Sequence, residues 1–194
     1  WVMGNSSYGL VPGGSQSSPV QVGTDTNWQD FAVGSWCANA LKTDGTLWAW
    51  GYGNKGALGL NSNPSTVNSP TQVGTDTTWS DISGSAGSHK CAIKTDGTLW
   101  TWGDNADGIL GQGQDPGEFG YRSSPTQVGT DTTWSNVSFG TDKNIMATKT
   151  DGTLWTWGDG MQGQMGNSTA GNPSHYSSPV QIPGTGWDTT RLGI

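Results

Sequence analysis

The stretch TDGTLWAWG at residues 43–51 returns as TDGTLWTWG at residues 95–103 and once more at residues 150–158. A catalytic site is normally needed once per chain. A phrase that occurs three times, each time with two tryptophans, indicates a structural unit instead. The phrase therefore predicts a repeated architecture.

Each phrase combines a turn with the strand that follows it. Asp-Gly favours a two-residue hairpin turn, because a type I′ turn requires positive φ angles that glycine adopts readily. Side chains alternate along a strand, so Trp100 and Trp102 are predicted on one face of a sheet, with Leu99 and Thr101 on the other. We expect the bulky face of one sheet to pack against the smaller face of the next, so that every interface between sheets is the same.

A second phrase recurs in phase with the first. SPVQVGTDTNW begins at Ser18, and versions of it begin at Ser69, Ser124 and Ser178, spaced 51, 55 and 54 residues apart. Each copy is predicted to hold four short strands: one led by proline, one led by tryptophan, one ending in Lys-Thr-Asp, and the Leu-Trp strand after the hairpin. Four strands in a period of about 50 residues are typical of a β-propeller.

The composition agrees with an all-β protein. The chain of 194 residues contains 32 glycines and 12 tryptophans, only 12% of it is charged, and no long segment has helical periodicity. A net charge of −7 with scattered basic residues disfavours nucleic acid as a partner. No apolar run is long enough to predict insertion into a membrane.

Three longer runs carry a family resemblance. They read DGTLWAWGYGNKGALG at 44–59, DGTLWTWGDNADGILG at 96–111 and DGTLWTWGDGMQGQMG at 151–166. This pattern resembles the repeat of the regulator of chromosome condensation (RCC1) family, in its bacterial or phage type. The resemblance implies an all-β propeller, a ring of about seven blades that are each a four-stranded antiparallel sheet.

The chain is long enough for about four such blades. We expect a single RCC1-like repeat domain over residues 1–194, with repeat phases near 1–47, 48–99, 100–154 and 155–194. Such an arc leaves blade faces open, which predicts either a longer chain or self-association through those faces.

Three runs that resemble nucleotide-binding or metal-binding motifs are interpreted as structural. GYGNKG at 51–56 and GDGMQG at 158–163 match the dinucleotide fingerprint, but no helix is predicted after either, so their glycines are assigned to tight loops between blades. DNADG at 104–108 resembles the start of a calcium loop and lacks its terminal glutamate. No cofactor or metal is expected.

The remaining reactive residue types form no evident site. His89 and His175 are expected at the surface, and no spacing selects a catalytic pair among the carboxylates. Cys37 and Cys91 are interpreted as small buried apolar residues, with a disulfide left open. No catalytic residue and no enzyme activity are predicted.

The copies differ most in the loops after each Leu-Trp strand, and variable loops on a rigid frame are where recognition usually lies. The predicted binding residues are Tyr52, Lys55, Phe119, Tyr121, Arg122, Met161 and Tyr176. Their predicted partner is another protein or a surface glycan.

The predicted function is a non-catalytic protein-recognition or structural assembly module, extracellular, at a bacterial surface or in a phage virion. One alternative is an inhibitor of a secreted enzyme that binds through the propeller rim. Another is guanine-nucleotide exchange, the activity of the eukaryotic member that gives the family its name, although a pI near 4.4 suits its chromatin role poorly.

Overall fold

The computed structural model of the chain describes residues 1–4, 8–85, 87–113, 120–140, 143–161, 163–166 and 175–187. In these ranges the regular structure is β-strand apart from two single-turn 3₁₀ helices, η1 (Asn54–Gly56) and η2 (Ala106–Gly108). The strands are β1 (Val2–Gly4), β2 (Gln16–Val20), β3 (Trp28–Val33), β4 (Cys37–Lys42), β5 (Leu47–Gly51), β6 (Val67–Gln72), β7 (Trp79–Gly84), β8 (His89–Lys94), β9 (Leu99–Asp104), β10 (Tyr121–Gln127), β11 (Trp134–Phe139), β12 (Asn144–Lys149), β13 (Leu154–Asp159) and β14 (His175–Ile182).

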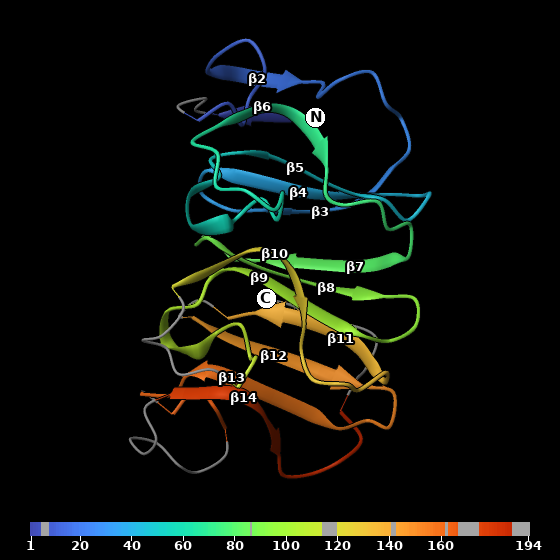
Figure 1. Cartoon of the computed structure of the whole chain (residues 1–194). Helices are drawn as coiled ribbons and strands as arrows, with labels where there is room; N and C mark the ends of the chain where they lie inside the picture. The colour runs from blue at the N-terminus through green and yellow to red at the C-terminus, as the bar shows by residue number, and fades with distance from the viewer. Residues whose placement is uncertain are drawn as a thin grey trace.

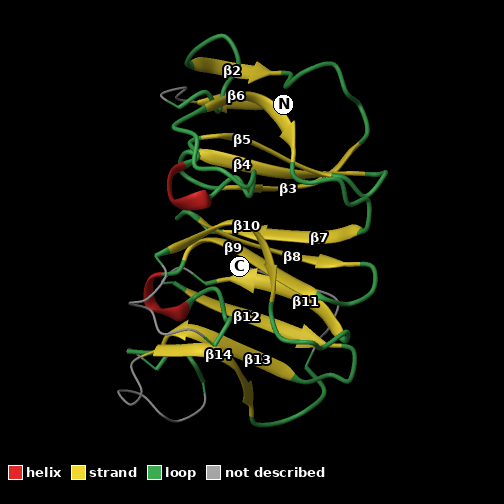
Figure 2. Cartoon of the chain, viewed as in Figure 1, coloured by secondary structure: helices red, strands yellow, loops and turns green. Residues whose placement is uncertain are grey.

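These strands form three four-stranded antiparallel sheets and one two-stranded sheet. We call β3–β6 the first blade, β7–β10 the second, β11–β14 the third, and β1–β2 the N-terminal sheet. Figure 1 shows them following one another from the N-terminal sheet at the top to the third blade at the bottom, and Figure 2 shows how little of the chain is helical. The predicted all-β class and antiparallel four-stranded blades are confirmed.

The proline-led strand completes a blade from its outer side. It pairs with the Leu-Trp strand that precedes it in the chain, as β10 pairs with β9, and it does not pair with the tryptophan-led strand that follows. The tryptophan-led strands are the inner ones, since β7 contacts both β3 and β11 in the neighbouring blades.

In every blade the repeated Asp-Gly-Thr sequence joins the hairpin turn to the first tryptophan of the next strand by the same hydrogen bonds. The Asp96 carboxylate accepts hydrogen bonds from the backbone N–H and hydroxyl of Thr98, and the Thr98 oxygen accepts one from the indole N–H of Trp100. Gly97 has a φ of +78°, and a Cβ there would collide with the carbonyl oxygen of Thr132 in the next blade. The turn therefore requires glycine for both its own geometry and its neighbour. The expected two-residue type I′ turn is wrong, however: Lys94 N–H donates to the Thr98 carbonyl and Gly97 N–H to the Lys94 carbonyl, so the loop has three residues, and Gly97 alone among them has a positive φ.

The interface between blades has the two unlike faces expected from the sequence. Trp102 of the second blade is fully buried, in one cluster with Leu47 and Ala49 of the first. Trp157 of the third blade is likewise buried against Leu99 of the second. The predicted packing of a bulky face on a smaller face is confirmed at both interfaces.

A caged lysine also recurs in each complete blade. The Lys94 ammonium lies 2.8 Å from the Asp76 carboxylate, 4.7 Å from the ring centre of Trp79 and 4.0 Å from that of Trp100. Lys42 and Lys149 have the same surroundings in the first and third blades. Most of each lysine is buried, so the ring contacts belong to the blade's own packing.

The N-terminal side of the first blade is open. Phe31 is 71% exposed, whereas Ile82 and Val137, at the equivalent register in β7 and β11, are 6% and 4% exposed. A cavity of about 480 Å³ lies beside it, lined in part by Trp28 and Trp50.

Cys37 and Cys91 are both buried and unpaired. Burial raises the pKa of the Cys91 thiol well above its ordinary value. The interpretation of both cysteines as small buried apolar residues is confirmed, and the disulfide that the sequence left open is not formed.

Candidate functional site

The loops that distinguish the repeats emerge at one end of the blades. After β5 and β9 the chain enters η1 and η2, and the turns that join β3 to β4, β7 to β8 and β11 to β12 lie at the same end. We call this end the loop face; it lies on the left in Figures 1 and 2.

One backbone hydrogen bond marks equivalent positions on the loop face. The N–H of Tyr52 donates to the carbonyl of Trp36 at 2.7 Å, and in the next two blades Asp104 donates to Ser88 and Asp159 to Lys143. Trp36, Ser88 and Lys143 are therefore equivalent, as are Tyr52, Asp104 and Asp159.

The loop of the preceding blade adds a third position. WVMGNSSYGL at 1–10 aligns with WAWGYGNKGA at 48–57, which makes Tyr8 equivalent to Lys55, and the next copy places Asp107 there. Lys55 and Asp107 both adopt positive φ, 53° and 63°. Each junction between neighbouring sheets thus presents three equivalent side chains. We number the junctions from the N-terminal sheet.

The first junction is aromatic. Tyr8 lies 4.6 Å from Tyr52 and 5.7 Å from Trp36 between ring centres, and Trp36 lies 6.0 Å from Tyr52. Trp36 is 53% exposed. We call these three residues the aromatic junction.

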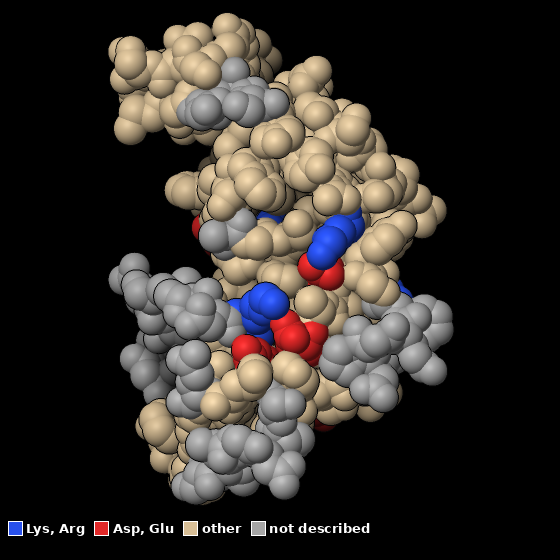
Figure 3. All heavy atoms as spheres, turned by 90° about the vertical axis from the view of Figure 1, so that its left-hand side faces the viewer, with Lys and Arg blue, Asp and Glu red and all other residues tan. Residues whose placement is uncertain are grey.

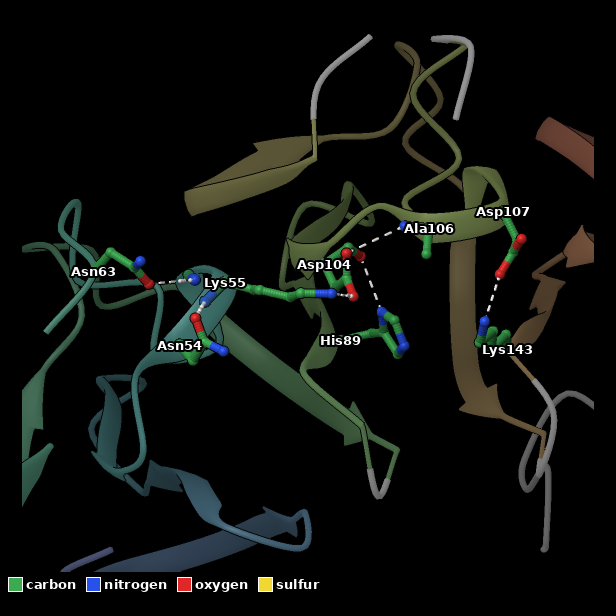
Figure 4. Close-up of polar contacts among 9 residues, drawn as sticks. Asn54, Lys55, Asn63, His89, Asp104, Ala106, Asp107 and Lys143 are labelled. Atoms are coloured by element: carbon green, nitrogen blue, oxygen red, sulfur yellow. Dashed lines mark hydrogen bonds and ion pairs between the residues drawn. The ribbon is translucent and has the colours of Figure 1, made fainter. Parts of the chain in front are cut away.

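The second and third junctions are charged. Lys55 of the first blade binds the Asp104 carboxylate of the second at 2.6 Å, and Lys143 of the third blade binds Asp107 of the second at 2.8 Å (Figure 4). The hydrogen bond that Lys143 donates to the Asp107 carboxylate raises the pKa of Lys143. Figure 3, which looks onto this face, shows the charged atoms gathered beside the middle of the arc, with none on its upper part.

His89 lies beneath the second junction. Its Nδ1 is 2.9 Å from the Asp104 carbonyl oxygen (Figure 4). Its ring stacks on Phe139 of the third blade. His89 is only 5% exposed, so its predicted surface position is wrong: it completes the contact between two blades. Burial lowers its pKa, which favours the neutral imidazole. His175 is partly exposed, as expected, and lies 3.7 Å from Asp107.

The structure brings only two of the predicted binding residues into these junctions, Tyr52 and Lys55. Met161 is 59% exposed on the same face, and its N–H donates to the Asp159 carboxylate. Phe119 lies outside the described residues.

The other three predicted residues lie on the outer strands. Tyr121 is 44% exposed opposite Asp104, and Arg122 donates from Nε to the Gln112 side chain at 3.1 Å. Tyr176 packs against the core cluster of the third blade.

Tyr8 and Trp36 were missed because the sequence comparison concentrated on one loop. Trp36 belongs to the turn between the first two strands of a blade, where the copies read WC at 36–37, SH at 88–89 and KN at 143–144 around the equivalent strand start. Comparing this turn between copies would have found the exposed tryptophan.

The last glycine of the motif at 51–56 serves the contact between blades, because a Cβ on Gly56 would collide with the backbone carbonyl of Arg122 in the second blade. Gly108, its equivalent in the second blade, likewise lies against Ser177 in the third. For Gly56 this confirms the assignment to a tight loop between blades. Within the described ranges, no three metal-ligating side chains form a group, and no helix there is long and apolar enough to cross a membrane.

The fold has close relatives among solved structures. Human WBSCR16 superposes with a TM-score of 0.75 at 22% identity, over 93% of this chain and 46% of that one. Prp20p from Saccharomyces cerevisiae gives 0.69 at 20% identity, over 82% and 39%.

Curated relatives are also similar in sequence. The RCC1 domain-containing protein RUG3, mitochondrial, of Arabidopsis thaliana is 30% identical over 86% of this chain, and the chain covers 39% of RUG3. The ultraviolet-B receptor UVR8 of the same plant is 27% identical, over 93% of this chain and 38% of the receptor. The probable E3 ubiquitin-protein ligase HERC6 of Homo sapiens is 28% identical over 71% of this chain, which covers 13% of HERC6.

The chain thus spans less than half the length of each of these relatives. They are eukaryotic and give no support to the predicted bacterial or phage type. The family model described as the regulator of chromosome condensation (RCC1) repeat matches residues 44–93, 96–145 and 151–187. On this evidence the chain belongs to the RCC1 repeat family.

Proposed function

We propose that this chain is a non-catalytic protein-recognition module that binds its partner through the loop face. The main support for the proposal is the contrast between interior positions, which repeat from blade to blade, and junction positions, which do not. The cages and the interface tryptophans are the same in every complete blade, whereas the three junction positions change from aromatic to charged.

Rigid support makes this face suitable for recognition. Each junction lies over a sheet interface that buries a tryptophan, so the exposed side chains are held with little freedom to lose on binding. Aromatic and charged side chains on such a frame are typical of protein interfaces.

Two related structures concern binding to other proteins, which supports the proposal. One concerns the binding properties of Prp20p to Gsp1p and histones, and another shows Kap60 bound to yeast RCC1. Recognition of proteins is therefore compatible with this fold. Nucleotide exchange and enzyme inhibition receive no separate support from the loop face, and action outside the cell, at a bacterial surface or in a virion, stays a prediction, as does binding of a glycan.

The experiment is selection of a displayed random-peptide library on the immobilised protein, followed by titration of the selected peptides. The double variant Trp36→Ser/Tyr52→Asp removes the aromatic junction, and Lys55→Ala opens the second junction. The control, Asp76→Asn, changes an exposed carboxylate at the opposite end of the blades. We expect Kd to rise about tenfold or more for a loop-face variant and to stay unchanged for the control. Selected peptides whose Kd is unchanged by every loop-face variant would overturn the proposal.

Self-association is a second proposal, carried by the open face of the first blade. Phe31 is exposed there although its equivalents are core residues. Light scattering should give a molar mass above that of one chain, and Phe31→Ser should lower it. A single-chain mass at every concentration would contradict self-association.

A further inference from the structure

We propose that the aromatic junction is a docking site for a lysine or arginine side chain in a basic segment of a partner protein. This inference rests on the proposed function and names the chemistry of its partner.

The fold does not require aromatic residues at these positions. Trp36 is replaced by Ser88 in the second blade and by Lys143 in the third, and the backbone hydrogen bond to the neighbouring strand is kept. Trp36 also leaves 53% of its surface exposed, so its burial contributes less to folding than that of an interface tryptophan. An aromatic cluster that the frame does without in two blades out of three has a use outside folding.

The geometry of the rings suits a cation. Aromatic faces are electronegative, and a cation within about 6 Å of a ring centre is attracted to them, tryptophan most strongly. The three rings of the aromatic junction lie tilted or edge-on to one another at 4.6–6.0 Å. One side chain inserted at the cluster would therefore contact more than one ring.

The same chain already holds ammonium groups in this way. Lys42 places its nitrogen 3.7 Å from the ring centre of Trp48 and 4.9 Å from that of Trp28. Lys94 and Lys149 repeat the arrangement in the other two blades. Paired aromatic rings on this frame are thus compatible with a bound ammonium group, and at the aromatic junction no lysine of the chain fills that role.

Charge complementarity selects a basic partner. Five of the six lysines are each ion-paired with an aspartate, and the sixth, Lys90, is buried with its nitrogen on backbone carbonyls. The charged side chains of the loop face lie at the second and third junctions, and the net charge of −7 makes the chain as a whole negative. A basic segment is attracted to it, and an acidic segment is repelled.

The test uses dye-labelled peptides of equal length in which glycine alternates with lysine, arginine, serine or glutamate. Fluorescence anisotropy should show binding of the lysine and arginine peptides alone. Trp36→Ser should weaken that binding about tenfold or more, because the ring that attracts a cation most strongly is lost. Trp187→Ser removes a tryptophan that is 43% exposed at the opposite end of the blades, beside the turn at Gly152, and should leave Kd unchanged. Tyr52→Ser is the second variant: it removes another ring of the cluster without adding a charge, and it should also weaken binding of the basic peptides.

Three results would overturn the inference. Equal binding of the basic peptides to wild type and Trp36→Ser would show attraction by net charge alone. Trp36-dependent binding of the serine or glutamate peptide would leave the proposed function standing and refute the cationic partner. A molar mass that falls on Trp36→Ser would assign the cluster to contact between copies of the chain.

Discussion

At the first junction of the loop face three aromatic rings contact one another, whereas at the second junction the equivalent positions carry an ion pair and a serine. The backbone is the same at both, since Tyr52 donates to Trp36 as Asp104 donates to Ser88. The interfaces beneath the second and third junctions repeat one another, because each buries a tryptophan against a leucine-bearing face. Beneath the first junction Trp50 is also buried, beside the cavity on the open side of the first blade. The positions that repeat are therefore those on which folding depends, and the positions that vary are surface positions available for recognition.

The largest effect is expected for an interface tryptophan. Trp102 is fully buried between the first and second blades. Trp102→Ala should lower the free energy of unfolding by about 3–5 kcal/mol, through lost burial and the cavity left behind. Denaturant unfolding measures this change. If Trp102→Ala lowered the free energy of unfolding as little as a substitution at an exposed residue does, the blade interior would not differ from the junctions in its contribution to stability.

A caged lysine should rank next. Lys94→Met keeps the apolar stem but removes the charge between two rings and opposite Asp76. We expect a loss of about 1–2 kcal/mol, most of it from the ring contacts because Asp76 is largely exposed. Asp76→Asn is the matched control and should cost less. If both variants cost the same, the ion pair and not the cage would be the stabilising element.

The second junction should make stability depend on pH through His89. Burial lowers the pKa of His89, so the folded protein resists a proton that the unfolded chain takes up below about pH 6.5. Its contribution is fully present above that pH and is lost as the pH falls toward the folded pKa, with a slope of at most about 1.4 kcal/mol per pH unit. His89→Asn introduces the residue found at the equivalent position 144. Urea unfolding of both proteins across this range should show a smaller pH dependence for the variant, and parallel curves would contradict the assignment.

The smallest effect is expected for the ion pair itself. Lys55 is half exposed, so Lys55→Ala should cost about 1 kcal/mol or less, and added salt should shrink the difference from wild type. A larger loss of unfolding free energy that does not depend on salt would show that the second junction stabilises the fold. The second junction would then resemble the blade interior in this respect.

Much of the fold was predictable because the residues that determine it recur in every copy of the repeat. Asp-Gly predicts the place of the hairpin but not its turn type, alternation predicts the faces of Trp100 and Trp102, and the period predicts the architecture. The partner of the proline-led strand was not predictable in this way, because a strand at the boundary between copies is next in sequence to two neighbours and pairs with one.

The site was predictable only in part. Tyr52 and Lys55 stand out in the variable loop, but Trp36 joins them from a different turn and Tyr8 from the preceding sheet. His89 looks like a surface residue in sequence because its burial comes from Phe139, fifty residues further on. Contacts between blades determine the burial and the neighbours of these residues, and a local sequence pattern does not predict such contacts.

The most direct test of the distinction between junction and interior is denaturant unfolding of Trp36→Ser/Tyr52→Asp, which places the residues of the second junction at two of the three positions of the first and leaves Tyr8. We predict a free energy of unfolding within about 1 kcal/mol of wild type, because neither residue is part of the repeated interior. A loss of several kcal/mol, comparable to that of Trp102→Ala, would show that the aromatic junction is part of the core and would contradict its assignment to recognition.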